Sequence, residues 1–536
     1  MFRRLGLGLL IPAALLLAGG ALAQPAVPPE RPLPESTADH AKFDELDGPF
    51  ASGPEVTKAC LACHTEAGEQ FMHSIHWTWR FAHPETGQVI GKRNIINSFC
   101  GSIVANEPRC TSCHAGYGWE DEASFDFTDQ TAMDCLVCHD TTATYVKAPA
   151  GAGRPVLDEP VTHHGKTLEP VDLAHVAQNV GATSAETCGS CHFYGGGGDN
   201  VKHGDLSSAL VDPPVALDVH MAADGADLGC TDCHVGSAHR WAGSRYAVEA
   251  RDPVGTGLPG ERRDVATCES CHGLRPHPEP TVTHLELNDH VARVACQTCH
   301  VPAFARGGHA TKMYWDWSEA GRLNDEGEPY VETDADGRAV YKTKLGAFRW
   351  DEDVVPTYRW FDGQVRYTLV DDEIDPEGVV PINRFDGAAS DPASRIWPFK
   401  AMGATQPFDS WNQNLVYNQL FDPGSDAAFW ETFDFDRSIR AAMAEANADF
   451  SGEYDFVETV MWWPITHTVP PAEQSVTCEG CHARDGRMAD IAGVYIPGRD
   501  GDRRVDLVGY LAVGVALAGV GLHAAGRWIS ARRRAS

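Results

Sequence analysis

The residues best able to do chemistry in this chain form one short pattern that occurs eight times, Cys-x-x-Cys-His. Two thiols at this spacing reach the two vinyl groups of one haem, and the adjacent imidazole then meets the iron from below. The pattern therefore predicts eight covalently attached haem c groups. We number the motifs 1 to 8 along the chain: Cys60/Cys63/His64, Cys110/Cys113/His114, Cys135/Cys138/His139, Cys188/Cys191/His192, Cys230/Cys233/His234, Cys268/Cys271/His272, Cys296/Cys299/His300 and Cys478/Cys481/His482.

The cysteine count supports the same interpretation. The motifs use sixteen of the seventeen cysteines, so only Cys100 is left over. A disulfide framework needs no histidine after every second cysteine, and zinc sites would pair two motifs and require further ligand pairs. Cys100 therefore belongs to no haem-attachment motif. It could attack or hold a sulfur species, or be an inert buried cysteine beside Phe99, and the sequence leaves both readings open.

The first residues predict export. Residues 1–23 contain Arg3 and Arg4, then an apolar run, then Ala21-Leu22-Ala23 before Gln24. This order is typical of a secretory signal peptide that is cleaved after Ala23. Export suits haem c, which is attached outside the bacterial cytoplasm. Residues 24–54 are rich in proline and predict an extended leader to the first motif.

The last residues predict a membrane anchor. Leu507 to Gly526 are twenty residues without a formal charge, long enough at roughly 1.5 Å per residue to cross a hydrocarbon core of ~30 Å. We expect a transmembrane helix over 505–527 and a basic cytoplasmic tail over 528–536. Because basic residues that flank a span stay in the cytoplasm, the body should face the periplasm from the inner membrane. The alternative is a buried C-terminal helix.

The net charge of the chain limits the classes of molecule that it can bind. The formal net charge is −32, and removing the two arginines of the signal and the net +3 of residues 505–536 leaves −37 for the body. Such an acidic body excludes nucleic-acid binding and favours cationic redox partners. A small anionic substrate would need a locally basic entrance, for which Lys92, Arg93 and Arg109 are candidates.

The spacing of the motifs divides the body. Seven motifs lie within residues 55–300, which leaves too few residues per haem for separate apolar cores, so we expect short helices and loops around stacked porphyrins. Residues 301–424 are aromatic-rich, and Phe361-Asp362-Gly363-Gln364 predicts a hairpin there. Residues 425–500 predict a helical segment that carries motif 8. The expected fold class is a mainly α multihaem cytochrome c with an irregular or strand-bearing insert and one C-terminal transmembrane helix.

The distal sides of the irons need further ligands. Sixteen of the twenty-four histidines lie outside the motifs, enough to cap every iron. The sequence does not pair these caps with haems, and His73, His83, His163, His164 and His284 compete for the role. The predicted caps are His76, His175, His203, His220, His239, His277, His290 and His467.

Beyond its motifs, the chain resembles the octahaem tetrathionate reductase family, which is related to hydroxylamine oxidoreductase and pentahaem nitrite reductase. The members of this family are soluble periplasmic proteins. The predicted transmembrane helix at the C-terminus of this chain therefore departs from the family pattern. The segments that carry the resemblance are His73–Trp79, Asn97–Cys100, Cys188–Gly198, Asn200–Asp205, Cys296–Pro302 and Lys312–Trp317.

The resemblance implies one catalytic haem, bound by motif 2 and capped by a lysine, with a free cysteine nearby. Lys202 and Cys100 match best, and Asp205 is a candidate proton donor. A lysine amine must be neutral to bind iron, and such a ligand would be displaceable by a substrate. Lys92, Lys147 and Lys166 remain alternatives, and Lys202 could instead be a surface residue or a propionate partner beside His203.

Two hypotheses therefore compete. The first is a reductase of small sulfur or nitrogen oxyanions (tetrathionate, nitrite or hydroxylamine) that takes electrons from an inner-membrane quinol-oxidising cytochrome or a periplasmic redox protein. The second is a conduit in which all eight irons are capped. Hydroxylamine oxidation is disfavoured, because no tyrosine can be identified as the cross-link to the reactive haem; Tyr495 is the sole tyrosine shortly after motif 8.

Overall fold

The computed structural model describes residues 38–163, 166–250, 266–278 and 281–535. The predicted signal peptide, residues 24–37 of the predicted leader and His164 lie outside these ranges. Residues 38–54 of that leader are not simply extended. They form two 3-10 turns, His40–Lys42 and Asp44–Leu46, and Leu46 is buried against the helix Leu173–Gln178.

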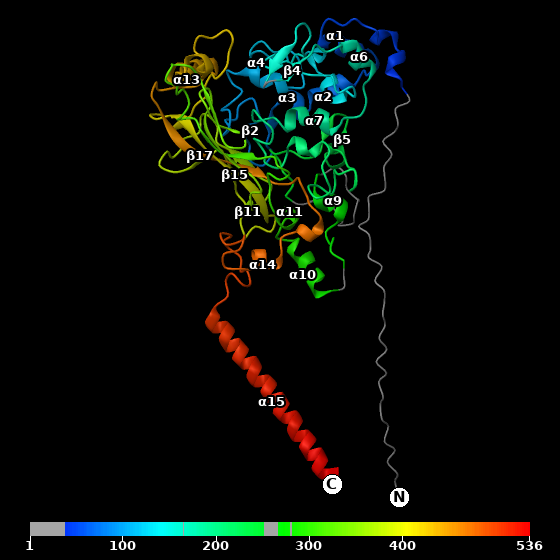
Figure 1. The fold of residues 1–536 in the computed structure, drawn as a ribbon, viewed down its shortest axis with the longest axis vertical. Helices are drawn as coiled ribbons and strands as arrows, with labels where there is room; N and C mark the ends of the chain where they lie inside the picture. The colour runs from blue at the N-terminus through cyan, green and yellow to red at the C-terminus, as the bar shows by residue number, and fades with distance from the viewer. Residues whose placement is uncertain (1–37, 164–165, 251–265, 279–280, 536) are drawn as a thin grey trace.

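We call residues 55–300, together with motif 8, the motif region. Short helices and loops make up this region, and most motifs occupy one helical turn (Figure 1). Local capping starts several of these turns. Ser184 caps the helix of motif 4 by accepting a hydrogen bond from the Thr187 amide, while the Thr187 hydroxyl accepts one from the Ser184 amide. The helices are α1 (Gly53–Cys63), α2 (Ala67–Met72), α3 (Ile75–Thr78), α4 (Glu107–Cys110), α5 (Leu136–His139), α6 (Leu173–Gln178), α7 (Ala185–His192), α8 (Cys230–Cys233), α9 (Cys268–His272), α10 (Val282–His290), α11 (Cys296–His300) and α14 (Cys478–Cys481).

A nine-stranded sheet forms the other half of the body. Its order is β13-β17-β15-β7-β10-β9-β8, and β11 and β16 also pair with β15. The long antiparallel pair of β15 and β17 runs in register from Phe399 opposite Pro464 to Asp409 opposite Tyr454. The strands are β7 (Thr311–Asp316), β8 (Val331–Thr333), β9 (Ala339–Lys342), β10 (Gly346–Asp351), β11 (Thr357–Phe361), β13 (Val380–Pro381), β15 (Arg395–Asp409), β16 (Asn414–Leu415) and β17 (Tyr454–Pro464).

The largest apolar core lies on this sheet. Trp315, Phe399, Met402 and Trp463 are almost fully buried there. Helix α13 (Phe435–Glu445) covers it with an apolar face at helical spacing. The strand-bearing insert therefore holds the main core of the protein. A mainly α fold class is not confirmed, because this sheet is the largest assembly in the body.

Two local predictions were wrong. Residues 425–500 were predicted to be a helical segment, which holds for α12 (Phe429–Thr432) and α13, but Tyr454–Pro464 is strand β17. Its buried residues alternate, a period of two that indicates a strand.

The predicted hairpin at residues 361–364 is a corner between sheets. Strand β11 pairs with β15, whereas β12 (Val365–Tyr367) pairs with β14 (Asn383–Phe385). Asp362 accepts a hydrogen bond from the Gln364 amide, and Gly363 has φ +94°. A Cβ at Gly363 would lie 2.2 Å from the Val248 carbonyl oxygen, so the turn packs on another segment where only glycine fits.

Helix α15 (Arg503–Ala535) projects from the body (Figure 1). Within its Arg503–Arg534 segment, an apolar stretch of 18 residues has a mean hydropathy of 2.0, and none of that stretch is buried. By length and composition it can cross a membrane, and the predicted span 505–527 lies within it. The predicted tail 528–536 continues the same helix as far as Ala535.

Candidate functional site

Six pairs of imidazole rings are the clearest sign of cofactor sites. In each pair a motif histidine faces a histidine from elsewhere, with ring centroids 6.0 to 6.3 Å apart. That separation suits one metal ion held between two ring nitrogens, because metal–nitrogen bonds are about 2 Å long. These residues fit a haem iron with two imidazole ligands. The pairs are His64 with His40, His192 with His76, His234 with His467, His272 with His220, His300 with His277 and His482 with His290.

Five of the eight predicted caps occur in these pairs. Sequence reasoning missed His40, because it placed that residue in the leader; the nearby Phe43, an aromatic residue in a proline-rich stretch, was the available signal. The remaining three predicted caps form no such ring pair among the described residues, although His239 interacts electrostatically with His139 of motif 3 and His203 with His192 of motif 4. His175 lies 3.5 Å from the Asn179 amide nitrogen, His203 packs against Trp463, and His239 packs against Phe71 and Trp241.

Contacts between neighbouring motifs indicate the order in which electrons could pass from haem to haem. The Cys60 thiol hydrogen-bonds to Cys135, Cys188 to Cys230, and Cys268 to Cys296. Electrostatic contacts also join motif 3 to motif 4, motif 5 to motif 6 and motif 7 to motif 8. The order is therefore motifs 1, 3, 4, 5, 6, 7 and 8. Motif 2 joins at motif 4, through a hydrogen bond between the thiols of Cys113 and Cys191.

Cys271, the second cysteine of motif 6, differs from Cys268 in its contacts. The contact of motif 6 with motif 7 is made by Cys268, whereas the Cys271 sulfur accepts a hydrogen bond from the hydroxyl of its neighbour Ser270 at 3.9 Å. Cys271 is partly buried, as are most of the motif cysteines. The geometry therefore places Cys271 in the motif 6 turn but not on the route between motifs, and its attachment to haem stays a prediction that rests on the motif.

Motif 2 has different surroundings. His114 is fully buried and faces no second imidazole among the described residues. Its ring lies among Trp77, Trp79, Trp119, Phe125 and Phe127. Burial lowers the pKa of His114 to about 3, so the imidazole is neutral, the form that binds a metal.

The side chain of Lys202 lies deep in the body beside motif 2 and keeps part of its surface accessible. Its nitrogen is 5.4 Å from the centre of the Trp463 ring and interacts electrostatically with Cys113. Burial, followed by the charges of Arg245 and Lys92, holds the pKa of Lys202 well below its ordinary value. This environment therefore favours the neutral amine, which is the form that can bind a metal.

A solved relative decides the family. The crystal structure of an octahaem cytochrome c from Shewanella oneidensis matches with a TM-score of 0.72 and 40% identity, covering 84% of this chain and 95% of that chain. The chain belongs to the octahaem cytochrome c family. A family model described as bacterial cytochrome c also matches residues 312–485. An uncharacterized protein of Archaeoglobus fulgidus is 24% identical over 257 residues, 40% of this chain and 84% of that protein.

The free thiol of this octahaem cytochrome lies near motif 2. Cys100 is 3.9 Å from the Gly196 carbonyl oxygen, in the glycine-rich loop that precedes Lys202. Burial raises the pKa of Cys100 to about 11, more than the nearby Lys312 charge lowers it. The residue is therefore a protonated thiol, which is a poor nucleophile in this state.

Asp205 serves a different residue from the one predicted. Its carboxylate accepts hydrogen bonds from the backbone amides of Thr466 and His467 at 2.7 and 3.0 Å, and lies 3.2 Å from Nδ1 of His467. These bonds arise where β17 ends, and they turn the His467 ring toward His234. Asp205 thus positions the His467 imidazole through one carboxylate oxygen, and its role as a proton donor near Lys202 stays a prediction.

The other candidate lysines make different contacts, although two of them also lie beside motif 2: Lys147 donates a hydrogen bond to the His114 carbonyl, and Lys92 interacts electrostatically with Cys113. Lys147 forms a buried ion pair with Asp134 at 3.0 Å, and Lys166 is exposed on β4 (Lys166–Leu168). Lys92 lies 4.3 Å from the centre of the Trp79 ring. Arg93 pairs with Glu122, and burial lowers its pKa to about 10.

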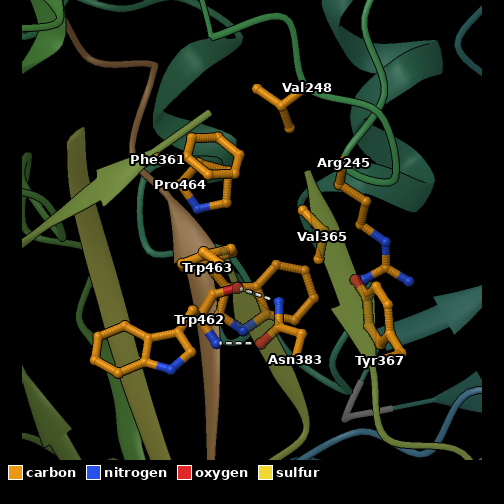
Figure 2. A pocket seen from close by; sticks show the side chains of 10 residues that line it. Arg245, Val248, Phe361, Val365, Tyr367, Asn383, Trp462, Trp463 and Pro464 are labelled. Atoms are coloured by element: carbon orange, nitrogen blue, oxygen red, sulfur yellow. Dashed lines mark hydrogen bonds between the residues drawn. The ribbon is translucent and has the colours of Figure 1, made fainter. Parts of the chain in front are cut away.

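Arg245 is a basic residue that sequence reasoning missed. Figure 2 shows it beside Tyr367, at the edge of a small crevice lined by Val365, Trp462 and Trp463. Its guanidinium is 5.1 Å from the Trp463 ring centre, and its buried Nη1 has no hydrogen-bond partner in the described part of the chain. A partly buried guanidinium that forms no ion pair with a carboxylate among the described residues is suited to bind an anion. Its Ser-Arg-Tyr context carries no signal for this role.

Lys400 of β15 fixes the backbone around Lys202. Its ammonium donates hydrogen bonds to the carbonyl of Val201 at 2.7 Å and of Lys202 at 3.2 Å, and to the Thr311 hydroxyl at 2.7 Å. The sheet therefore fixes the backbone of the Lys202 segment through the Lys400 side chain. This contact spans about two hundred residues of sequence, and the sequence gives no sign of it.

Proposed function

We propose that this protein is a membrane-anchored octahaem cytochrome c whose body faces the periplasm. It reduces small sulfur or nitrogen oxyanions (tetrathionate, nitrite or hydroxylamine) at the haem of motif 2, with Lys202 as the displaceable sixth ligand. The observation that carries the proposal is the neutral, deeply placed amine of Lys202 beside a motif whose histidine faces no second imidazole among the described residues.

The surroundings of Lys202 suit an anionic substrate. Arg245 and Lys92 both interact electrostatically with Lys202, so positive charge gathers at this point of a strongly acidic protein. Low local polarity strengthens the attraction between these cations and an anion. The residues of the chain would bind and orient the oxyanion, while the haem, when bound, would supply electrons and a Lewis-acidic iron.

The relay suits a supply of electrons to motif 2. The six imidazole pairs fit irons that are closed to substrate and only pass charge, and His239, which interacts electrostatically with His139, would close the iron of motif 3. Helix α15 would hold the body at the inner membrane, where a quinol-oxidising cytochrome could feed the relay, and a periplasmic redox protein is the alternative donor. The conduit hypothesis requires that the motif 2 iron also be closed.

The test is ligand binding and turnover of the holoprotein. We expect cyanide or nitrite to bind one haem in eight in the wild type and to change its absorption spectrum. In Lys202→His the imidazole would close that iron, so ligand binding should disappear and oxyanion reduction driven by reduced methyl viologen should fall at least about tenfold, or 1.4 kcal/mol.

The matched control is Lys166→His, an exposed lysine replaced in the same way, which should behave as the wild type. A wild-type protein in which every haem resists added ligands would overturn the proposal in favour of a conduit. Assays with tetrathionate, nitrite and hydroxylamine separately would identify the substrate.

A further inference from the structure

Motif 8 is fastened to the start of the membrane helix. We call residues 483–502, which join His482 to α15, the collar. The Nδ1 atom of His482 lies 3.1 Å from the Pro497 carbonyl oxygen, and Arg484 donates a hydrogen bond to the Gly501 carbonyl at 3.2 Å. Gly498 has φ +87°, and a Cβ there would lie 2.1 Å from the His482 carbonyl oxygen. The collar is thus folded tightly on motif 8, immediately before α15 begins.

Motif 8 is also one end of the relay. It adjoins motif 7, because Cys299 interacts with Cys481 and the Val476 amide donates a hydrogen bond to the Cys299 carbonyl at 2.9 Å. Motif 1, at the other end, lies on α1. Figure 1 shows α1 at the far end of the body from α14 and the departure of α15. A protein anchored by α15 therefore presents motif 8, and not motif 1, to the membrane.

The surface around motif 8 differs from the rest of the body. Helix α10, which supplies His290 to the pair with His482, exposes Val282 and Leu285 by 71% and 39%, and the collar exposes Tyr495 by 67%. Residues 483–504 contain five arginines and four aspartates, whereas the body as a whole is strongly acidic. Exposed apolar side chains beside a collar whose charges nearly cancel are typical of a docking surface, and the negative charge on α10 itself is confined to Glu286 and Asp289.

We propose that motif 8 is the electron port of the relay, and that a membrane-embedded, quinol-oxidising redox protein docks on α10 and the collar. This inference rests on the membrane anchoring in the proposed function. At the port, His482 and His290 would hold the haem iron, and that haem, when bound, would accept the one electron that the partner loses in each transfer. No proton or leaving group crosses the interface, because quinol oxidation and its proton release take place on the partner.

The experiment compares two sources of electrons for the full-length holoprotein in inner-membrane vesicles. Val282→Glu with Leu285→Glu adds negative charge to the docking surface. We expect haem reduction by quinol, followed by absorbance, to slow at least about tenfold. Reduction by dithionite, which needs no docking, should keep its wild-type rate and amplitude. The control is Val331→Glu with Val379→Glu, two valines of the sheet region that are each 57% exposed.

Three results would overturn the port. The α10 variant could be reduced by quinol at the wild-type rate, the control could slow equally, or the α10 variant could leave the membrane fraction, which would assign α10 to lipid binding. Failure of the proposed function is visible separately. It would appear as wild-type protein that accepts electrons from quinol but reduces no oxyanion with reduced methyl viologen.

Discussion

The motif region and the sheet region of this protein solve the packing problem in different ways. In the sheet region the chain supplies its own core, with Trp315, Phe399 and Met402 almost fully buried. In the motif region the apolar clusters are small, and every motif cysteine keeps part of its surface accessible. The difference indicates that haem completes the core of the motif region, whereas the sheet can be stable through side chains alone.

Strand β15 belongs to the sheet region and also contacts the motif region directly. Arg395 forms a buried ion pair with Glu269 of the motif 6 helix, and Lys400 fixes the Lys202 segment. The hydroxyl of Thr298, in motif 7, donates a hydrogen bond to the Ile396 carbonyl at 2.7 Å. The sheet thus positions the haem-binding segments through polar contacts, two of which end on backbone carbonyls.

The largest expected effect comes from removing a haem at the centre of the motif region. Cys188→Ala with Cys191→Ala prevents haem attachment at motif 4, which adjoins motifs 2, 3 and 5. We expect the motif region to lose its packing there and to be cleaved by trypsin at least about tenfold faster, while the sheet stays resistant. Mass spectrometry of the fragments would count haems and locate the cleavage sites.

The matched variant is Cys478→Ala with Cys481→Ala, which removes the haem at the end of the relay. It should expose only the collar and α10. Equal cleavage of the motif and sheet regions in the motif 4 variant would show that both depend on haem, and the distinction between them would fail.

The second prediction concerns the core of the sheet. Phe399→Ala removes a fully buried ring from β15 and should lower the free energy of unfolding by about 3–5 kcal/mol, with the haem content unchanged. Guanidinium unfolding followed by tryptophan fluorescence would measure it. Trp411→Ala, at a site that is 77% exposed, should change stability by at most about 0.5 kcal/mol. Loss of haem in Phe399→Ala would mean that the sheet core also supports the haem sites.

The third prediction tests the junction. Arg395 and Glu269 expose only 2% and 5% of their side chains, so Arg395→Met leaves an uncompensated buried carboxylate. The free energy of unfolding should fall by about 3–5 kcal/mol. Arg395→Met with Glu269→Leu should recover most of the loss, since both charges are then gone. If the double variant is as unstable as the single one, the ion pair also stabilises the contact between β15 and the motif 6 helix by a means other than charge neutralisation.

The sequence predicted the chemistry of the motif region better than its geometry. The motifs, five caps that face motif histidines and the octahaem resemblance all came from short local patterns. His40 was missed because its position opposite His64 depends on how residues 38–63 fold back. Arg245 and Lys400 were missed because their contacts join segments far apart in sequence. Motif position alone does not reveal such long-range pairs.

In the sheet region the errors were of another kind. The aromatic texture of residues 301–424 predicted strands, and β7 to β16 lie there. Strand β17 was assigned to a helix because the Ala-rich stretch of α13 just before it dominated the pattern, although its own burial alternates with a period of two. At Asp362-Gly363 the turn residues were recognised, but the strands on each side pair with different partners, and no local pattern encodes that choice.

A cavity at the boundary between the regions gives the smallest expected effect. Its volume is about 540 Å³, and its walls come from both sides of the boundary, with Glu107, Glu120 and Asp121 from the motif region and Asp422 and Glu445 from the sheet region. Glu107 begins the helix of motif 2 and is only 4% exposed. Burial, with a smaller contribution from Glu445, raises the pKa of Glu107 to about 7.

The sign of the resulting pH dependence follows from linkage. Because the pKa of Glu107 is higher in the folded protein, the folded state binds more protons between about pH 4.5 and pH 7, and stability falls as pH rises through that range. Glu107→Gln removes this loss. It should match the wild type near pH 4 and be more stable at pH 8, by up to about 3 kcal/mol.

Unfolding midpoints of the two proteins across this pH range would measure the difference, with Glu120→Gln, at the exposed rim of the same cavity, as the control. If Glu107→Gln were instead less stable than the wild type at pH 8, the ionised carboxylate would be favourable, and the cavity would supply positive charge or bound water to it. The two regions would then meet through solvated charge there, in contrast to the buried ion pair of Arg395 and Glu269.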